Sequence, residues 1–170
     1  HRLGIVAGTL PLREPGAERC AAASLVFGPD GARVARYDKI HLFDVDLPTG
    51  ESWRESSAYA GGERTVAVDT PIGRLGLTIC YDLRFPDLFR ALSDAGATIL
   101  SVPAAFTRPT GAAHWHLLLR ARAVENLCHV LAIGQGGEHP RVFRRFRDRR
   151  SRPAGRHRAS LCRAVDAACA

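Results

Sequence analysis

The cysteine at position 80 is the residue of this sequence best suited to covalent chemistry. Residues 74–89 read Arg-Leu-Gly-Leu-Thr-Ile-Cys-Tyr-Asp-Leu-Arg-Phe-Pro-Asp-Leu-Phe. Apolar positions lead into Cys80, and Pro86 opens a helical pattern, so we expect a buried strand followed by a strand-to-helix turn. Unpaired N–H groups at a helix start can lower the pKa of a thiol and stabilise an oxyanion. The alternative is a small buried hydrophobic cysteine, and this segment alone leaves both interpretations open.

Two further residues are candidates for the same site. Lys39 is the single lysine of a chain that has 23 arginines. Such a preference for arginine is typical of a GC-rich coding sequence. A lysine that is kept in such a sequence suggests a chemical role. Glu55 lies in the long segment 38–62, in which apolar residues recur at neither helical nor strand spacing. A cysteine attacking an amide needs a base, a cation facing the oxyanion and an acid for the leaving amine. Lys39 can supply the cation and Glu55 can move or orient protons, whereas a solvated lysine and an ordinary loop carboxylate are the alternatives.

The elements that must position these residues follow from the hydrophobic pattern. Strands are predicted over residues 3–8, 20–27, 32–37, 65–69, 74–80, 97–102 and 130–133, and helices over 86–95 and 113–127. The turn Gly-Pro-Asp-Gly at 28–31 joins the second and third strands into a hairpin. Segments 38–62 and 106–111 are expected to be loops. Hairpins combined with strand–helix–strand units predict an α/β layered domain with a mixed sheet.

The net charge of +7 is concentrated at one end of the chain. Residues 1–139 carry 14 Lys+Arg and 15 Asp+Glu, whereas residues 140–170 carry 10 arginines and two aspartates. We therefore divide the chain into a folded part, 1–138, and an Arg/Ala-rich tail, 139–170, which is either disordered or translated out of frame. A nucleic-acid binder would bind phosphates through the arginines of residues 141–158. That segment interleaves only two aromatic residues, so we expect no nucleic-acid partner.

Length and cysteine usage limit the class of protein further. A chain of 170 residues suits one domain with a sizeable core. Five cysteines without a repeated spacing argue against a disulfide framework and favour a reducing cytoplasm. The sequence contains neither an apolar run of about 20 residues nor a signal-peptide pattern, and no Cys-x-x-Cys pair or His/Cys cluster suggests a metal. We expect a cytoplasmic protein with no membrane partner, no metal and no cofactor.

Several blocks of the chain resemble one known family. They are Arg-Tyr-Asp-Lys-Ile-His-Leu-Phe-Asp-Val-Asp at 36–46, Arg-Glu-Ser at 54–56, Gly-Leu-Thr-Ile-Cys-Tyr-Asp-Leu-Arg-Phe-Pro at 76–86, Thr-Gly-Ala-Ala-His-Trp at 110–115 and Leu-Arg-Ala-Arg-Ala-Val-Glu-Asn at 119–126. In this order they are similar to the nitrilase superfamily of carbon–nitrogen hydrolases, nearest to the branch that contains omega-amidase and deaminated glutathione amidase. The resemblance covers residues 1–138.

This resemblance implies an αββα sandwich, normally paired as a homodimer through its helices, and a Glu–Lys–Cys triad. By position, Cys80 is the nucleophile, Lys39 stabilises the tetrahedral intermediate and Glu55 supports substrate and proton transfer. The backbone N–H of Tyr81 is the second oxyanion donor. The implied reaction is hydrolysis of a small carboxylate-bearing linear amide through a cysteine thioester, with ammonia released first.

Arg84 is the candidate for holding the carboxylate of the substrate. A guanidinium can bind a carboxylate through two parallel hydrogen bonds, but pairing with Asp82 or Asp87 is an equally good interpretation. His114 and His116 flank a tryptophan at the expected helix start and are more typical of structural histidines.

Two departures from the family pattern affect the functional prediction. The family's general-base glutamate lies well before the lysine, and the upstream carboxylates Glu14 and Glu18 have the wrong context, so neither is assigned. The sequence after residue 137 also differs from the family's glycine/aromatic hairpin. We therefore expect an incomplete chain, truncated at its N-terminus. The alternative is an inactive remnant, because loss of such a base costs about 10²–10⁴-fold in rate.

Overall fold

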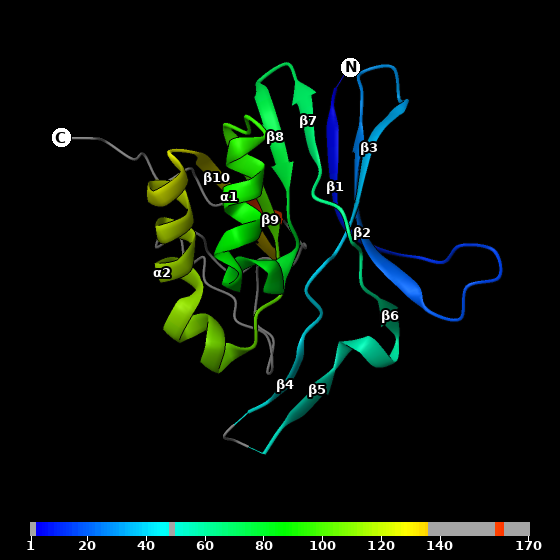
Figure 1. The fold of residues 1–170 in the computed structure, drawn as a ribbon, viewed down its shortest axis with the longest axis vertical. Helices are drawn as coiled ribbons and strands as arrows, with labels where there is room; N and C mark the ends of the chain where they lie inside the picture. The colour runs from blue at the N-terminus through cyan, green and yellow to red at the C-terminus, as the bar shows by residue number, and fades with distance from the viewer. Residues whose placement is uncertain (1–2, 48–49, 136–158, 162–170) are drawn as a thin grey trace, which may run out of the picture.

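The computed structural model describes residues 3–47, 50–135 and 159–161. Its layers are visible in Figure 1: α1 (Pro86–Asp94) and α2 (Arg108–Asn126) lie on one side of a sheet, and a second sheet lies on the other side. The strands are β1 (Ile5–Leu12), β2 (Cys20–Phe27), β3 (Arg33–Asp38), β4 (Asp44–Asp46), β5 (Ser52–Arg54), β6 (Tyr59–Ala60), β7 (Ala67–Thr70), β8 (Gly73–Leu77), β9 (Ile99–Pro103), β10 (His129–Gln135) and β11 (Ala159–Leu161).

The first sheet has the strand order β1-β2-β3, with all neighbours antiparallel, and β6 pairs with β2 in parallel. The predicted hairpin between β2 and β3 is confirmed. Its turn is closed by a hydrogen bond from the Gly31 N–H to the Gly28 carbonyl, 2.9 Å long. Gly31 has a φ of +82°, a conformation that glycine adopts without strain.

The second sheet has the order β11-β10-β9-β8-β7 and is mixed, as predicted. β8, β9 and β10 are parallel, because α1 and α2 supply the two crossover connections, whereas β7 and β11 are antiparallel to their neighbours. Pro86 begins α1 at its first turn, where a missing N–H costs nothing. Gly96, with a φ of +83°, follows the end of that helix.

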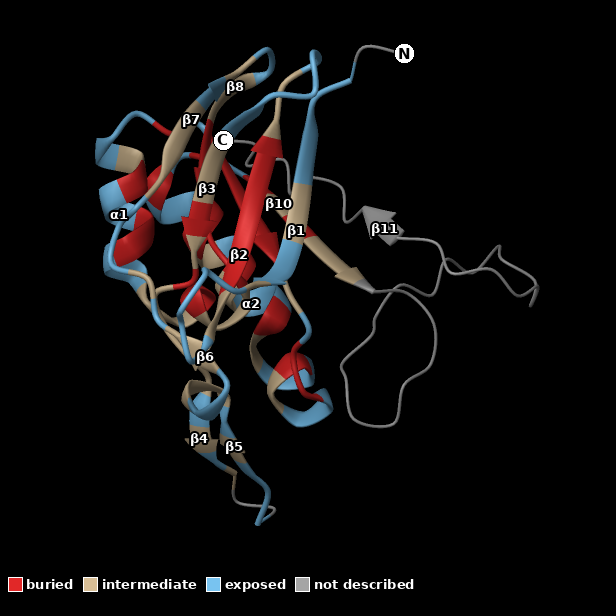
Figure 2. Ribbon diagram, turned by 90° about the vertical axis from the view of Figure 1, so that its right-hand side faces the viewer, coloured by how far each residue is buried: buried red, intermediate tan, exposed pale blue. Residues whose placement is uncertain are grey.

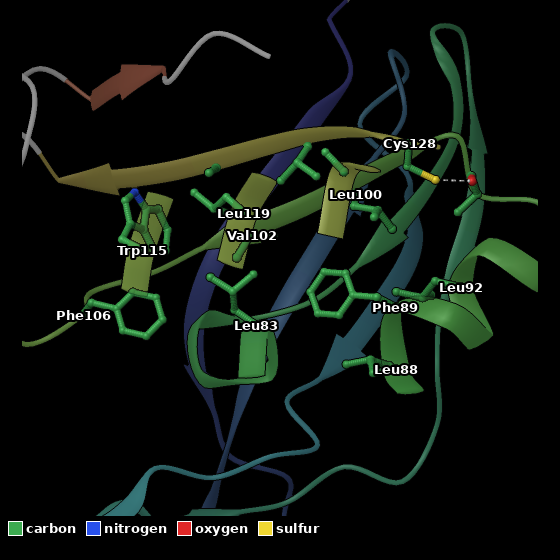
Figure 3. Close-up of a cluster of buried hydrophobic side chains, with 14 residues drawn as sticks. Leu83, Leu88, Phe89, Leu92, Leu100, Val102, Phe106, Trp115, Leu119 and Cys128 are labelled. Atoms are coloured by element: carbon green, nitrogen blue, oxygen red, sulfur yellow. Dashed lines mark hydrogen bonds between the residues drawn. The ribbon is translucent and has the colours of Figure 1, made fainter. Parts of the chain in front are cut away.

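Two clusters of buried side chains hold the layers together. The cluster between the helices and the second sheet (Figure 3) includes Phe89, Leu100 and Trp115. The cluster between the two sheets joins Val26 and Tyr37 of the first sheet to buried residues of β8 and β9 and to Ile79. In Figure 2, β2 is largely buried while much of β1 is exposed. Both the lysine end of β3 and the cysteine end of β8 are therefore fixed by the inter-sheet core.

Several predicted boundaries were wrong. The strand expected over 74–80 ends at Leu77, and the loop expected over 106–111 is largely the first turn of α2, which begins at Arg108. Pro109 fits this first turn because its φ is already helical. Segment 38–62 is not one loop. It contains β4, β5, β6 and the 3₁₀ helix η1 (Glu55–Ser57), and the β4–β5 hairpin projects from the body in Figure 1.

The predicted tail, 139–170, lies outside the described residues except for β11, which pairs with β10 in an antiparallel register. In the described part of the chain, no helix is both long enough and apolar enough to cross a membrane.

Candidate active site

Cys80 is the first residue of a 3₁₀ helix, η2 (Cys80–Arg84), that connects β8 to α1. This confirms the predicted turn between a strand and a helix. The cysteine has a φ of +50°, in the left-handed region that few non-glycine residues adopt. The residue keeps some exposure to solvent, although the chain packs closely around its thiol. A sharp turn of this kind lifts the thiol out of the sheet at the end of β8.

Lys39 and Glu55 meet although they are 16 residues apart. Lys39 follows the end of β3, and its side chain is only 3% exposed. Its Nζ forms an ion pair with the Glu55 Oε2, and this oxygen also accepts a 2.6 Å hydrogen bond from the backbone N–H of Phe43. Glu55 opens η1, so the small helix in the predicted loop is the element that presents this carboxylate.

The same two residues also act on the thiol of Cys80. Burial raises the pKa of Cys80, while the Lys39 ammonium and the Ala105 backbone N–H oppose this by stabilising the thiolate. The carboxylates of Glu55 and Asp82 raise the pKa of Cys80 further. Burial is the largest of these effects, so the resting form at neutral pH is the thiol. The structure therefore brings the three predicted residues into one electrostatic unit in which Cys80 rests as a thiol.

This assignment of the resting state predicts the pH dependence of alkylation. The rate at which iodoacetamide modifies Cys80 in the folded protein should reach half its maximum above the ordinary thiol value of about 8.5, because only the thiolate reacts. Peptide mapping by mass spectrometry measures the rate at each pH, and the protein unfolded in urea is the reference. A folded midpoint at or below the unfolded one would contradict a protonated resting thiol.

The raised pKa of Cys80 also affects the stability of the fold. The folded protein keeps a proton on Cys80 at pH values where the unfolded chain has lost it, so this thiol lowers the free energy of unfolding as pH rises above about 8.5. Burial also raises the pKa of Cys128, which acts in the same direction. Neither thiol destabilises the fold at neutral pH, because both keep their protons there in the folded and the unfolded chain.

Tyr81 and Arg84 lie on the same turn as Cys80. The Tyr81 ring makes edge contacts with Phe43 at 5.0 Å and Phe85 at 5.4 Å between centroids. The Arg84 guanidinium lies 5.9 Å from the Tyr81 ring, and its Nη2 is 3.3 Å from the His114 Nδ1. In the ranges that the structure covers, Arg84 forms no ion pair with Asp82, Asp87 or another carboxylate.

Sequence reasoning missed the carboxylate that lies deepest in this region. Asp82 is fully buried and accepts hydrogen bonds from Tyr37 and His41, on either side of Lys39. The signal that could have found it was a charged residue between Tyr81 and Leu83, just after an apolar strand. A carboxylate that is buried there needs hydrogen-bond partners. Those partners could not be named, because they are more than 40 residues away in the chain.

Glu14 and Glu18, which the sequence analysis left unassigned, lie in the connection from β1 to β2. The Glu14 carboxylate is exposed and forms an ion pair with Arg36, whose hydrogen bond lowers the pKa of Glu14. Glu14 is therefore a surface ion-pair partner. Among the residues that the structure describes, no group of three or more His, Cys, Asp or Glu side chains is arranged to hold a metal ion.

Comparison with known proteins identifies the class that this fold and site define. The model of the carbon-nitrogen hydrolase family matches residues 1–156, so the chain belongs to that family. The chain is similar to a deaminated glutathione amidase of Yersinia enterocolitica, with 53% identity over 137 residues, which cover 79% of this chain and 48% of that protein. It is also similar to omega-amidase NIT3 of Saccharomyces cerevisiae, with 42% identity over 127 residues, which cover 75% of this chain and 44% of that protein.

A solved structure supports the fold assignment. The NitFhit protein of Caenorhabditis elegans superposes with a TM-score of 0.76 and 44% identity, over 83% of this chain and 35% of that one. The predicted nitrilase-like sandwich is thereby confirmed. The chain spans about half the length of these curated relatives.

Proposed function

We propose that this chain is the nucleophile-bearing part of an amidase that hydrolyses a small, linear, carboxylate-bearing amide through a cysteine thioester. The observation that carries the proposal is the convergence of Lys39 after β3, Cys80 after β8 and Glu55 at the start of η1. A buried ion pair costs desolvation energy, which makes its placement beside a strained cysteine more typical of chemistry than of packing. Two of the relatives are also named as amidases.

The proposed reaction begins when a base takes the proton of Cys80 and sulfur attacks the amide carbon. The resulting oxyanion faces the Lys39 ammonium and the Tyr81 N–H, which stabilise charge that develops only in the transition state. The nitrogen takes a proton and leaves as ammonia, so the sulfur–carbon bond replaces the carbon–nitrogen bond. Water then attacks the thioester, releasing the carboxylic acid and restoring the thiol. Glu55 orients the Lys39 side chain through their ion pair and supports proton transfer. We assign the general base to no described residue.

Arg84 is the group that we assign to the substrate carboxylate. Its guanidinium has no carboxylate partner within the described chain, and it lies against the rings of Tyr81 and Phe106. These contacts hold the side chain on the turn that carries the nucleophile. A carboxylate bound there would place the other end of a short substrate near the thiol.

Ammonia release by the complete gene product tests this function. A linear amide with a terminal carboxylate should react faster than a neutral amide of equal length, and Arg84→Gln should lower kcat/KM for the charged substrate by about 10–100-fold while leaving the neutral one nearly unchanged. Arg90→Gln, on the exposed side of α1, is the matched control. Absence of ammonia from every amide tested would instead favour an inactive remnant, and an equal effect of Arg84→Gln on both substrates would remove its assigned role.

We also propose that the intact protein is a cytoplasmic homodimer that pairs through its helices. Leu117 and Val124 of α2 are more than 60% exposed and lie seven residues apart, on one face of the helix. The three cysteines of the described chain are free thiols, as a reducing compartment requires. Sedimentation velocity at micromolar concentration can show whether a dimer forms.

A further inference from the structure

The carboxylate of Asp82 lies between the two parts of the chain that carry the proposed catalytic groups. Asp82 is the third residue of η2, two positions after Cys80, and is 0% exposed. Its Oδ2 accepts a 2.8 Å hydrogen bond from the Ile79 backbone N–H, while its own N–H donates to the Ile79 carbonyl at 3.1 Å. These two bonds close the turn around Cys80 and fix the direction in which the thiol leaves the sheet.

The same carboxylate also holds the Lys39 segment from both sides. The Tyr37 hydroxyl donates to the Asp82 Oδ2 at 2.7 Å, and the backbone N–H of His41 donates to the Asp82 Oδ1 at 3.1 Å. The His41 Nδ1 lies 2.8 Å from that Oδ1. Since Tyr37 and His41 are each two residues from Lys39, the chain cannot shift along its axis at Lys39 without breaking one of these bonds.

A stacked ring pair supports the same junction. The imidazole of His41 lies on the Phe85 ring, with centroids 3.7 Å apart and planes inclined by 7°. Phe85 directly follows η2, so the turn that begins with Cys80 is joined to the Lys39 segment at both its middle and its end. Tyr37 is itself fully buried in the inter-sheet cluster, which limits its freedom to move.

We propose that Asp82 is a positioning residue that keeps the Lys39 ammonium aligned with the Cys80 thiol across the two sheets. The inference rests on the proposed roles of Lys39 and Cys80. Tyr37, His41 and Asp82 form one buried junction, and the carboxylate is the only group in it that accepts from both segments at once. Asparagine at this position has one acceptor oxygen instead of two. With its oxygen in place of Oδ2, the amide N–H₂ faces the backbone N–H of His41, and with its oxygen in place of Oδ1, it faces the Ile79 N–H and the Tyr37 hydroxyl. In either orientation one bond to the Lys39 segment is lost.

Because Lys39 is buried, the rate at which a reagent reaches its amine measures how well the Lys39 segment is held against the turn. Reaction of its amine with an N-hydroxysuccinimide ester, followed by peptide mapping, reports how often the Lys39 segment separates from the turn. In the complete gene product, Asp82→Asn and Tyr37→Phe should each accelerate acylation of Lys39 by at least about tenfold, corresponding to about 1.4 kcal/mol in the opening equilibrium. Tyr37→Phe removes one hydroxyl and keeps the ring, so it tests the junction if the aspartate variant fails to fold.

A second buried group separates local opening from general loss of stability. Cys128 is 5% exposed, packs in the cluster beneath the helices and donates its S–H to the Ala97 carbonyl. In the two variants its alkylation rate should stay within twofold of the unmodified protein. Asp69→Asn, an exposed carboxylate of β7 that pairs with Arg74, should change neither rate.

The outcomes are distinguishable from those of the amide assay, because no turnover is measured. Faster reaction at Lys39 without a change at Cys128 supports the positioning role, even if the amide assay is negative. Equal acceleration at both sites would mean that Asp82 only stabilises the fold and would overturn the proposal. Unchanged acylation of Lys39 in the two variants would overturn it as well.

Discussion

Replacing Cys80 by alanine should lower ammonia release from the preferred amide by more than about 10⁴-fold. If Cys80 is the nucleophile as proposed, its removal closes the thioester route altogether, whereas the rest of the site keeps its contacts. Alanine retains the Cβ and tolerates the left-handed backbone no worse than cysteine does. Stability should therefore change little, and the loss of rate can be assigned to chemistry. The measurement is the kcat for ammonia release, with circular dichroism as the test of folding.

Cys20→Ala is the matched control for this change, since Cys20 is a partly buried free thiol at the start of β2. It should keep nearly full activity. Mass spectrometry of a quenched reaction adds a direct test: the parent protein should carry an acyl group on the peptide of Cys80, and Cys80→Ala should carry none. Retention of activity in Cys80→Ala would assign the reaction to another residue.

Replacing Lys39 by methionine should lower the free energy of unfolding by about 3 kcal/mol and the amide kcat by about 10²–10³-fold. The structural effect arises because the Glu55 carboxylate is left beside the Phe43 N–H without its cation. The kinetic effect follows from the proposed reaction, in which the oxyanion would lose the charge that faces it. Urea unfolding and ammonia release measure the two effects separately.

The double variant Lys39→Met/Glu55→Gln distinguishes them further. Because neither partner is then left charged and alone, most of the lost stability should return, while the hydrolysis rate should stay low. Arg54→Met/Asp46→Asn, which removes an exposed ion pair of the β4–β5 hairpin, is the control and should change the free energy of unfolding little, because solvent screens exposed charges. If the double Lys39/Glu55 variant is no more stable than Lys39→Met, the two charges are not coupled in the way the structure indicates.

Much of the architecture could be predicted because it depends on local signals. Apolar runs located the central strands, Gly31 and Pro29 marked the hairpin turn, and Pro86 and Gly96 marked the ends of α1. The grouping of Lys39, Glu55 and Cys80 came from residue chemistry together with a family resemblance. The structure places these three residues together. Their catalytic roles remain predictions.

Other features could not be predicted, for different physical reasons. The elements β4, β5, β6 and η1 are only two or three residues long, too short for a hydrophobic period to develop. The partners of Asp82 depend on how two sheets pack, and pairing across sheets has no signature in local sequence. The start of α2 was placed too late because its first turn, from Arg108, contains few apolar residues and a proline.

The left-handed conformation of Cys80 has a consequence for engineering a more heat-resistant form of the protein. Adopting a φ of +50° costs a side-chain-bearing residue about 1–2 kcal/mol, and glycine avoids that cost. A library screened only for resistance to heating would therefore enrich glycine at codon 80, and its best members would lack the sulfur on which the proposed reaction depends. Selection for thermostability at this codon and selection for turnover act in opposite directions, so the codon should be kept fixed when the surrounding positions are randomised.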